Sequence, residues 1–245
     1  MPKGLAIINF DEDQSAKTRE PTISISGPVG VGKSTLIDEL RRKYCVKRRV
    51  PCFGEPAPIW IVELYYNNPK AFAAIFQAIC VTSLGFPQEL YSRAGLGFLI
   101  ERQGWDAVLF SELLLEKQLI SKTIFEQISS TVKAQIQQTD YTIVLIAGWL
   151  TCHQRIRKRN RKGEELVPVD FCKRLNSKYI EFYKRNFDSS KVFILLAEDS
   201  PSAVAKAAEN TLNHIRNIQV RPDFIGDRVT SLLRALTTIA TTTAP

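Results

Sequence analysis

Residues 22–35 read TISISGPVGVGKST. Within this stretch Gly27, Gly32, Lys33 and Ser34 have the spacing G-x-x-x-x-G-K-[ST] of a phosphate-binding loop. β-Branched residues alternate just before the loop, as they do in a strand, and apolar residues recur at helical spacing just after it. A strand, a glycine-rich loop and a helix in this order aim backbone N–H groups and a helix N-terminus at phosphate oxygens.

The side chains of this loop have separate predicted tasks. Lys33 is predicted to reach the β- and γ-phosphates of a nucleotide, and the Ser34 hydroxyl is predicted to bind Mg²⁺. A glycine-rich turn that binds no ligand is the alternative, but the flanking strand and helix favour nucleotide binding. The predicted phosphate-binding set comprises Gly27, Gly30, Gly32, Lys33, Ser34 and Thr35.

Composition sets limits on the organisation of the chain. It has 245 residues, of which 44% are apolar, enough for one sizeable core. We expect a flexible N-terminal arm over residues 1–20, one domain over 21–219 and a partly disordered C-terminal extension over 220–245. No apolar run is long enough for a membrane span. Five cysteines without zinc or disulfide spacing indicate a reducing compartment, the cytoplasm, which for a viral protein is that of the host cell.

The net charge of +8 is concentrated in two basic clusters, within residues 41–49 and 155–162. Either cluster could be a solvated face or a nucleic-acid contact, and the second cluster fits better a clamp on the phosphates of a nucleotide held by the loop. The arginines of the second cluster that lie four positions apart, Arg155 and Arg159, share a helix face. Like charges this close favour a mobile lid that closes over a nucleotide. A nucleotide-dependent nucleic-acid-binding protein remains the non-enzyme alternative.

Strand-like apolar runs alternate with segments of helical periodicity, which predicts an α/β fold with a parallel five-stranded sheet covered by helices on both faces. The predicted strands are residues 22–26, 50–53, 97–100, 141–147 and 192–196, and the predicted helices are residues 34–44, 59–66, 71–84, 107–119, 124–137, 170–187 and 202–218.

Polar side chains follow several of these strands, where ligands of parallel sheets bind. Glu55 follows the second strand and is a candidate general base, although a surface glutamate is the simpler alternative. Glu101 and Arg102 follow the third strand and suggest a metal-side carboxylate with a charge partner, or else a structural ion pair. Gln77 is the odd polar residue in an apolar helix and, beside Phe76, is suited to reading a base edge.

Together these pieces resemble the deoxyribonucleoside kinases, the family of the cellular deoxynucleoside kinases and the herpesviral thymidine kinases. The resemblance runs from about residue 22 to about residue 199 and implies a P-loop kinase fold with an arginine-rich lid. The matching pieces are the GPVGVGKS loop, Glu55-Pro56 with Trp60 after it, Tyr66 to Lys70, Phe76-Gln77, Glu101-Arg102, the arginine segment that ends at Glu164, and Val167-Pro168.

The resemblance implies a role for each residue. Glu55 would accept the proton of the 5′-hydroxyl, Arg102 would keep Glu55 charged, and Lys33 would complete the catalytic set. Glu101 and Ser34 would lie on the Mg²⁺ side, while Arg155, Arg159 and Arg161 would neutralise the migrating phosphoryl group of ATP. Tyr66 and Glu164 would hold the sugar 3′-hydroxyl, and Gln77 would read the base. The implied substrate-binding set is Trp60, Tyr66, Phe76, Gln77, Cys80, Leu84, Arg102, Ala107, Phe110 and Glu164.

The implied acceptor is thymidine or another pyrimidine deoxynucleoside. Leu84 and Ala107 are apolar at positions where deoxycytidine- and purine-preferring relatives carry a charged pair, which leaves room for the thymine methyl group. A thymidylate kinase, or an enzyme with both activities, is the alternative. An inactive regulatory relative is disfavoured because Lys33, Glu55 and Arg102 are all present. The resemblance also implies a homodimer, with no membrane and no specific nucleic-acid partner.

The chain departs from the family pattern in two places. Gln103, Gly104 and Trp105 follow Arg102 with one residue fewer before Phe110, a spacing closer to that of the viral thymidine kinases. Residues 148–150 read Gly-Trp-Leu where a serine- or threonine-proline turn is usual.

Overall fold

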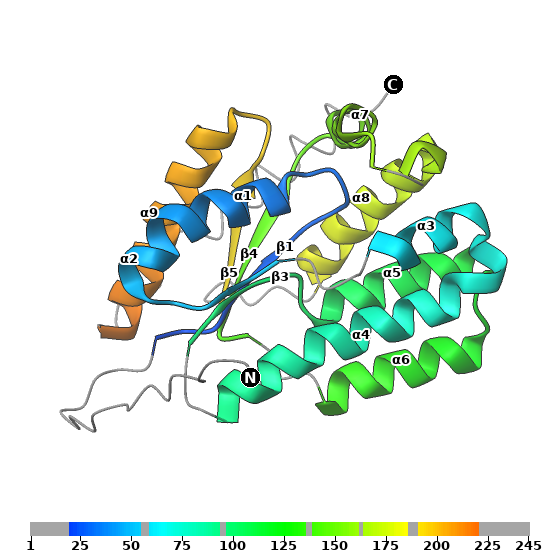
Figure 1. Ribbon diagram of the computed structural model, residues 1–245, viewed down its shortest axis with the longest axis horizontal. Coiled ribbons are helices and arrows are strands. Elements are labelled where there is room, and N and C mark those ends of the chain that lie inside the picture. The colour runs from blue at the N-terminus through cyan, green and yellow to red at the C-terminus, as the bar shows by residue number, and fades with distance from the viewer. Residues whose placement is uncertain are drawn as a thin grey trace, which may run out of the picture.

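The fold is built on five short parallel strands (Figure 1). The computed structural model describes residues 20–54, 59–93, 97–135, 139–161, 164–185 and 191–220. The strands are β1 (Ile23–Ser26), β2 (Cys52–Phe53), β3 (Leu99–Glu101), β4 (Tyr141–Ile146) and β5 (Val192–Leu196). Their order is β2-β3-β1-β4-β5, so β1 lies at the centre and its carboxyl end opens between β3 and β4. This confirms the predicted parallel five-stranded sheet.

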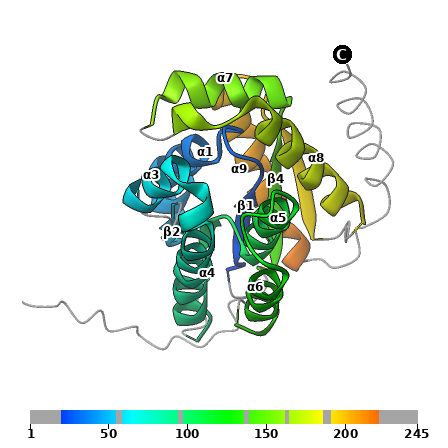
Figure 2. The same ribbon diagram turned by 90° about the vertical axis from the view of Figure 1, so that its right-hand side faces the viewer.

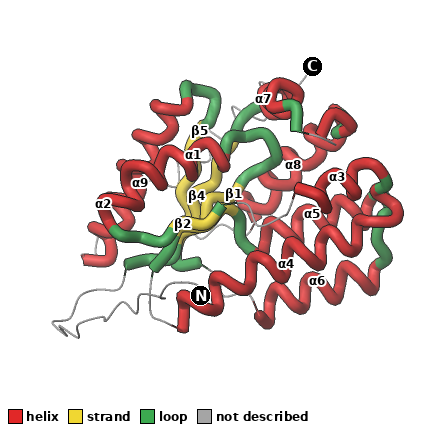
Figure 3. Tube along the Cα trace, in the orientation of Figure 1, coloured by secondary structure: helices red, strands yellow, loops and turns green. Residues whose placement is uncertain are grey.

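Helices cover both faces of the sheet (Figure 2). Figure 3 separates the red helices from the yellow sheet, with α1 and α9 on one side and α5 and α8 on the other. The helical elements are α1 (Lys33–Leu40), the π-helix η1 (Arg41–Cys45), α2 (Val46–Arg48), α3 (Ile59–Asn67), α4 (Pro69–Arg93), α5 (Gly104–Glu116), α6 (Lys122–Gln135), α7 (Trp149–Arg159), the 3₁₀ turn η2 (Glu164–Leu166), α8 (Val169–Arg185) and α9 (Pro201–Val220).

Apolar clusters form on each side of the sheet. Ile25 packs with the α1 residue Ile37 on one side, whereas Val144 packs with Leu109 of α5 and Leu175 of α8 on the other. Five successive β4 residues, from Thr142 to Ile146, are buried, which is expected only when a strand is covered on both faces. The sheet is therefore a rigid support, and the loops at its carboxyl edge can carry the chemistry.

Several sequence-based boundaries change in the structure. The helix expected over 71–84 extends over Pro69–Arg93, and the helix expected over 107–119 begins three residues earlier, at Gly104. Leu113 and Leu114 of α5 are each 1% exposed and pack inside the protomer, so they offer no apolar surface to a second copy of the chain. The predicted homodimer stays a prediction.

Parts of the predicted domain layout lie outside the described residues. These are nearly all of the N-terminal arm, because the description begins at residue 20, and the C-terminal extension beyond residue 220. The single-domain assignment over 21–219 stays a prediction. Among the helices that the structure describes, none is both long enough and apolar enough to cross a bilayer.

Candidate active site

The phosphate loop connects the buried end of β1 to the start of α1. Gly27, Gly30 and Gly32 have φ values of +142°, +80° and +109°, which side chains with a Cβ rarely adopt. A Cβ on Gly30 would lie 2.3 Å from the carbonyl oxygen of Cys152 in α7, so a glycine is also needed there for close packing. The Lys33 ammonium is buried and donates a hydrogen bond to the Pro28 carbonyl oxygen at 2.9 Å.

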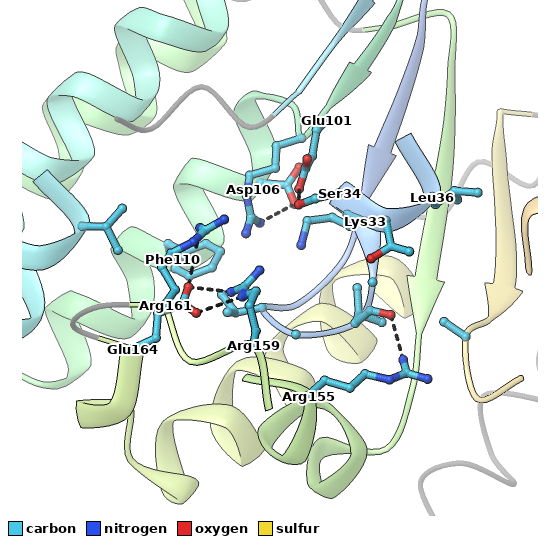
Figure 4. A pocket seen from close by; sticks show the side chains of 18 of the residues that line it. Lys33, Ser34, Leu36, Glu101, Asp106, Phe110, Arg155, Arg159, Arg161 and Glu164 are labelled. Carbon is cyan, nitrogen blue, oxygen red and sulfur yellow. Dashed lines mark hydrogen bonds and ion pairs between the residues drawn. The ribbon is translucent and has the colours of Figure 1, made fainter. Parts of the chain in front are cut away.

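A cavity of about 570 Å³ begins at this loop and continues between α3, α4 and α5. Its volume lies within the range typical of small-molecule sites. One half is lined by the phosphate loop, the lid helix α7 and the start of α9, and the other by aromatic and apolar side chains. The loop half and the aromatic half therefore form one continuous site, part of which is drawn in Figure 4.

An acidic group faces the start of α1. The Ser34 hydroxyl donates a hydrogen bond to Oε1 of Glu101 at 3.0 Å (Figure 4). Oε2 of Glu101 is buried and has no hydrogen-bond partner. An unsatisfied buried carboxylate oxygen beside a hydroxyl oxygen fits Mg²⁺, which uses one or two protein oxygens and takes its other ligands from phosphates and water. No larger cluster of His, Cys, Asp and Glu side chains suited to a metal occurs among the described residues.

Arg102 has an unusual backbone conformation and a buried guanidinium. Its φ of +72° is rare for a residue with a long side chain, and its backbone N–H donates to the Ile25 carbonyl oxygen at 2.9 Å. The guanidinium donates to the Tyr179 hydroxyl at 3.3 Å and lies 5.0 Å from the ring centroid of Phe110. Strained backbone of this kind is often found at active sites, where the surrounding contacts hold it.

The far half of the cavity has the features of a pocket for a planar ring. Tyr65 and Phe76 stack with ring centroids 4.8 Å apart, and burial raises the pKa of Tyr65 to about 12. Gln77 is 2% exposed, and its Oε1 lies 3.5 Å from the Ser111 hydroxyl, the outer limit of a hydrogen bond. Leu84 and Ala107 are buried apolar residues that line the cavity. A ring could therefore bind among apolar groups beside one polar amide.

The predicted arginine-rich lid comprises α7 and, after it, Arg161 and Glu164. Arg155 donates to the Val31 carbonyl oxygen of the phosphate loop at 3.0 Å. Arg159 makes a two-pronged pair with Glu164, with N–O distances of 3.0 and 2.5 Å, and Arg161 lies 3.7 Å from the same carboxylate (Figure 4). Glu164 is 3% exposed. Both oxygens of the Glu164 carboxylate therefore accept hydrogen bonds from Arg159.

Most of the predicted site residues lie together along this cavity. Those that line it are Gly30, Gly32, Lys33, Ser34, Thr35, Tyr66, Phe76, Gln77, Cys80, Leu84, Glu101, Arg102, Ala107, Phe110, Arg155, Arg159, Arg161 and Glu164. Gly27 reaches the site through its carbonyl oxygen, which accepts a hydrogen bond from Arg102 at 3.4 Å. Trp60 is 57% exposed and is not among the lining residues, so its substrate contact stays a prediction. Glu55, the predicted general base, lies outside the described residues.

Other lining residues were missed from the sequence. Asp106 is four positions after Arg102, a helical spacing that could have revealed the pair. Tyr65 also lines the cavity, although the sequence predicted a substrate contact only for its neighbour Tyr66. Asp199 and Pro201 follow β5 and line the loop half of the cavity. The one signal that could have revealed them is the rule that ligands of parallel sheets bind at the carboxyl ends of the strands.

Comparison with known proteins identifies the family. The sequence profile described as "Deoxynucleoside kinase" matches residues 23–220, which include every element of the fold. The chain belongs to the deoxynucleoside kinase family. The enzyme is therefore a kinase that transfers a phosphoryl group to deoxynucleosides and takes part in their salvage.

Named relatives of this kinase include viral proteins. It is 29% identical over 159 residues to the "Putative kinase protein 029R" of Invertebrate iridescent virus 3, a match that covers 64% of this chain and 79% of that protein. It is 25% identical over 166 residues to the thymidine kinase of Ictalurid herpesvirus 1. This match covers 63% of this chain and 71% of that protein.

Solved structures agree on the fold. A structure of deoxyadenosine kinase from M. mycoides has a TM-score of 0.66 and 23% identity, and the match covers 79% of this chain and 99% of that one. At this identity the likeness shows the fold alone, and it confirms the P-loop kinase fold.

Proposed function

We propose that this kinase catalyses the ATP-dependent 5′-phosphorylation of a deoxyribonucleoside, with thymidine as its best acceptor and Glu55 as the general base. The observation that carries the proposal is the continuous cavity. It joins the phosphate loop to a pocket for a planar ring, and Gln77 lines that pocket. A donor nucleotide and a nucleoside can therefore lie end to end, as in-line phosphoryl transfer requires.

The donor half supplies positive charge for a polyphosphate. Lys33 and two arginines of α7, Arg155 and Arg159, line the cavity, and so do the first residues of α1, whose N-terminus favours anions. Mg²⁺ would be held by the Ser34 hydroxyl and Glu101, where it would neutralise charge on the phosphates. Phosphoryl transfer needs positioning and charge neutralisation more than covalent chemistry, and these groups are suited to both.

The acceptor half favours a pyrimidine with an apolar edge. Gln77 can donate and accept at a base edge, while Leu84 and Ala107 offer no polar partner to a further exocyclic amine. A methyl-sized difference in such a pocket is worth only about 1–3 kcal/mol. The kcat/KM for thymidine is therefore expected to exceed that for the other pyrimidine deoxynucleosides by a modest factor. The relatives named above include both a thymidine and a deoxyadenosine kinase, so the ranking has to be measured.

Glu164 is proposed to bind the sugar 3′-hydroxyl together with Tyr66. In the structure it is paired with Arg159, so the pair has to loosen or be shared when both substrates bind. The Glu55 carboxylate that is proposed beside the 5′-hydroxyl would repel an acceptor that already carries a phosphate there, which argues against thymidylate as the main acceptor.

The test is a panel of ATP-dependent phosphorylation rates with thymidine, deoxycytidine, deoxyadenosine, deoxyguanosine and thymidine monophosphate. We expect thymidine to give the highest kcat/KM, and Glu55→Gln to lose at least ~10²-fold in kcat while it still binds ATP, because general-base catalysis contributes ~10²–10⁴-fold. A clear lead for purines would overturn the acceptor assignment. Activity on the monophosphate alone would support a thymidylate kinase.

A further inference from the structure

A buried carboxylate with no part in the reaction proposed above lies beside the cavity. Asp106 of α5 is 1% exposed and lines the cavity wall. Its Oδ1 accepts hydrogen bonds from the Ser26 hydroxyl at 2.7 Å and from the Tyr179 hydroxyl at 2.5 Å. Its Oδ2 accepts one from the backbone N–H of Gln103 at 2.8 Å. The donors come from β1, α8 and the start of α5, so this carboxylate is fixed by separate elements of the fold.

The cluster connects directly to Arg102. The Tyr179 hydroxyl gives its single hydrogen to Asp106, which leaves its oxygen to accept the hydrogen bond from Arg102 at 3.3 Å. The same guanidinium nitrogen lies 3.8 Å from Oδ1 of Asp106. Tyr179 is 1% exposed, so both groups act where water does not compete.

Arg102 needs such support for two reasons. Its left-handed backbone is strained and is held by a few surrounding contacts. Its side chain has many rotamers, and a guanidinium placed above the Phe110 ring could slide along the cavity wall unless its nitrogens were bonded. The hydrogen bonds to Tyr179 and to the Gly27 carbonyl oxygen fix one end of the guanidinium beside the phosphate loop.

We propose that Asp106 and Tyr179 are positioning residues that orient the Arg102 guanidinium toward the reacting hydroxyl. This rests on the proposed function with Glu55 as the general base, which Arg102 would keep charged as the family resemblance implies. Because a misplacement of about 1 Å can cost ~10²-fold in rate, loss of either group lowers kcat by roughly 10- to 100-fold. The KM values for ATP and thymidine change by less than about 2-fold, since neither residue is assigned a contact with the donor or with the base.

The first test compares two tyrosines on the same helix. Tyr179→Phe removes the hydroxyl that bonds Arg102 and keeps the ring. Tyr183→Phe is the matched control: Tyr183 is 3% exposed, one turn along α8, and its hydroxyl bonds Ser26 and Gln103. Each variant loses one buried hydroxyl of the same cluster, but only the Tyr179 hydroxyl contacts Arg102, so a loss confined to Tyr179→Phe cannot come from removal of a buried hydroxyl alone. We expect a kcat loss in Tyr179→Phe and a kcat within about 2-fold of wild type in Tyr183→Phe.

The second test asks whether Tyr179 acts through Arg102. In an Arg102→Lys background the added Tyr179→Phe change is expected to lower kcat by less than about 2-fold, because the group that it positions is already altered. Asp106→Asn, which keeps the shape of the side chain, is expected to show the same kcat-selective loss as Tyr179→Phe.

The outcomes separate this inference from the proposed function. A wild-type enzyme that phosphorylates no deoxynucleoside would overturn the proposed function. An active wild type in which the two tyrosine variants behave alike, or in which the Tyr179→Phe loss persists in full beside Arg102→Lys, would overturn the positioning role alone.

Discussion

At the scale of single residues, Glu101 is in an unusual electrostatic position. One of its oxygens accepts a hydrogen bond from Ser34, while the other is buried without a partner. An unpartnered buried carboxylate oxygen destabilises a protein, because the group leaves water without a new bond. Such a cost is understandable if the oxygen faces the place where a cation binds together with the nucleotide.

This leads to a prediction for Glu101→Gln. Without Mg²⁺ the variant is expected to unfold at the same or a higher temperature than the wild type, since an amide costs less to bury than a charged carboxylate. With Mg²⁺ its affinity for ATP is expected to fall by ~10-fold or more, about 1.4 kcal/mol. Thermal unfolding and titration calorimetry with and without Mg²⁺ measure both effects. Glu126→Gln on the exposed side of α6 is the control. Equal Mg²⁺-dependent affinity in the two variants would exclude Glu101 from the metal side.

The site residues that the sequence predicted are those with local or family signals. The glycines and Lys33 share one motif, and Gln77 stands out in an apolar helix. Asp106 and Tyr179 were missed because their contact joins positions 73 apart and depends on how α5 packs against α8. The pairing of Arg159 with Glu164 was also missed, because the family pattern predicts their contacts with ligands and not with each other.

At the scale of elements, α7 is held at its start by a residue from another loop. Oε1 of Glu198, after β5, accepts the backbone N–H of Gly148 at 2.5 Å, and its Oε2 accepts the Thr151 hydroxyl at 3.0 Å. Gly148 precedes the first residue of α7, so a negative charge lies at the positive end of the helix that carries the lid arginines. The Gly-Trp-Leu sequence at this point, a departure from the family pattern, therefore begins a helix that is capped from a distance.

We predict that Glu198→Ala loosens the lid. Loss of a helix cap costs about 1 kcal/mol, and the misplaced α7 arginines are expected to raise the KM for ATP several-fold while the KM for thymidine changes little. Thr151→Ala, which removes only one of the two contacts, should have a smaller effect in the same direction. Steady-state kinetics with each substrate varied in turn provides the measurement. An unchanged KM for ATP would mean that α7 is held by its other contacts.

Element types were predicted better than their ends. The five predicted strands lie within two residues of those observed, because buried parallel strands are short apolar runs between polar loops. The helix predicted over 34–44 changes to a π-helix at Arg41–Cys45, and its continuation stops at Arg49, which has a φ of +55°. No glycine or proline marks that change, so the pattern of apolar residues could not reveal it.

At the scale of the whole molecule, several tyrosines are buried in the core. Burial raises the pKa of Tyr44 and of Tyr65 to about 12 from an ordinary value of 10.0. Burial, reinforced by the nearby Asp106 carboxylate, also raises the pKa of Tyr179 and of Tyr183. These shifts mean that the folded state favours the neutral phenol.

Stability is therefore predicted to fall in alkali. A raised folded-state pKa gives a contribution that is fully present below pH 10.0, the unfolded value, and is lost as the pH rises to about 12. For Tyr65 the shift corresponds to about 3 kcal/mol, since one pKa unit is worth about 1.4 kcal/mol. Melting temperatures measured from neutral pH upward should stay level and then drop above about pH 10. In Tyr65→Phe the drop should be smaller, and an equal drop would contradict the assignment.

The strand order also bears on how the chain is made. The central strand β1 pairs on one side with β4, whose residues come 118 positions later in the chain. At a synthesis rate of about 5–20 residues per second, that separation amounts to roughly 6 to 24 s on the ribosome. During this interval the strand that ends in the phosphate loop lacks β4, and until β3 has been made it lacks both of its neighbours. The nucleotide site, although its phosphate loop is encoded near the start of the chain, is therefore completed only after about four fifths of the polypeptide has emerged, because Pro201 of the 245 residues also lines it.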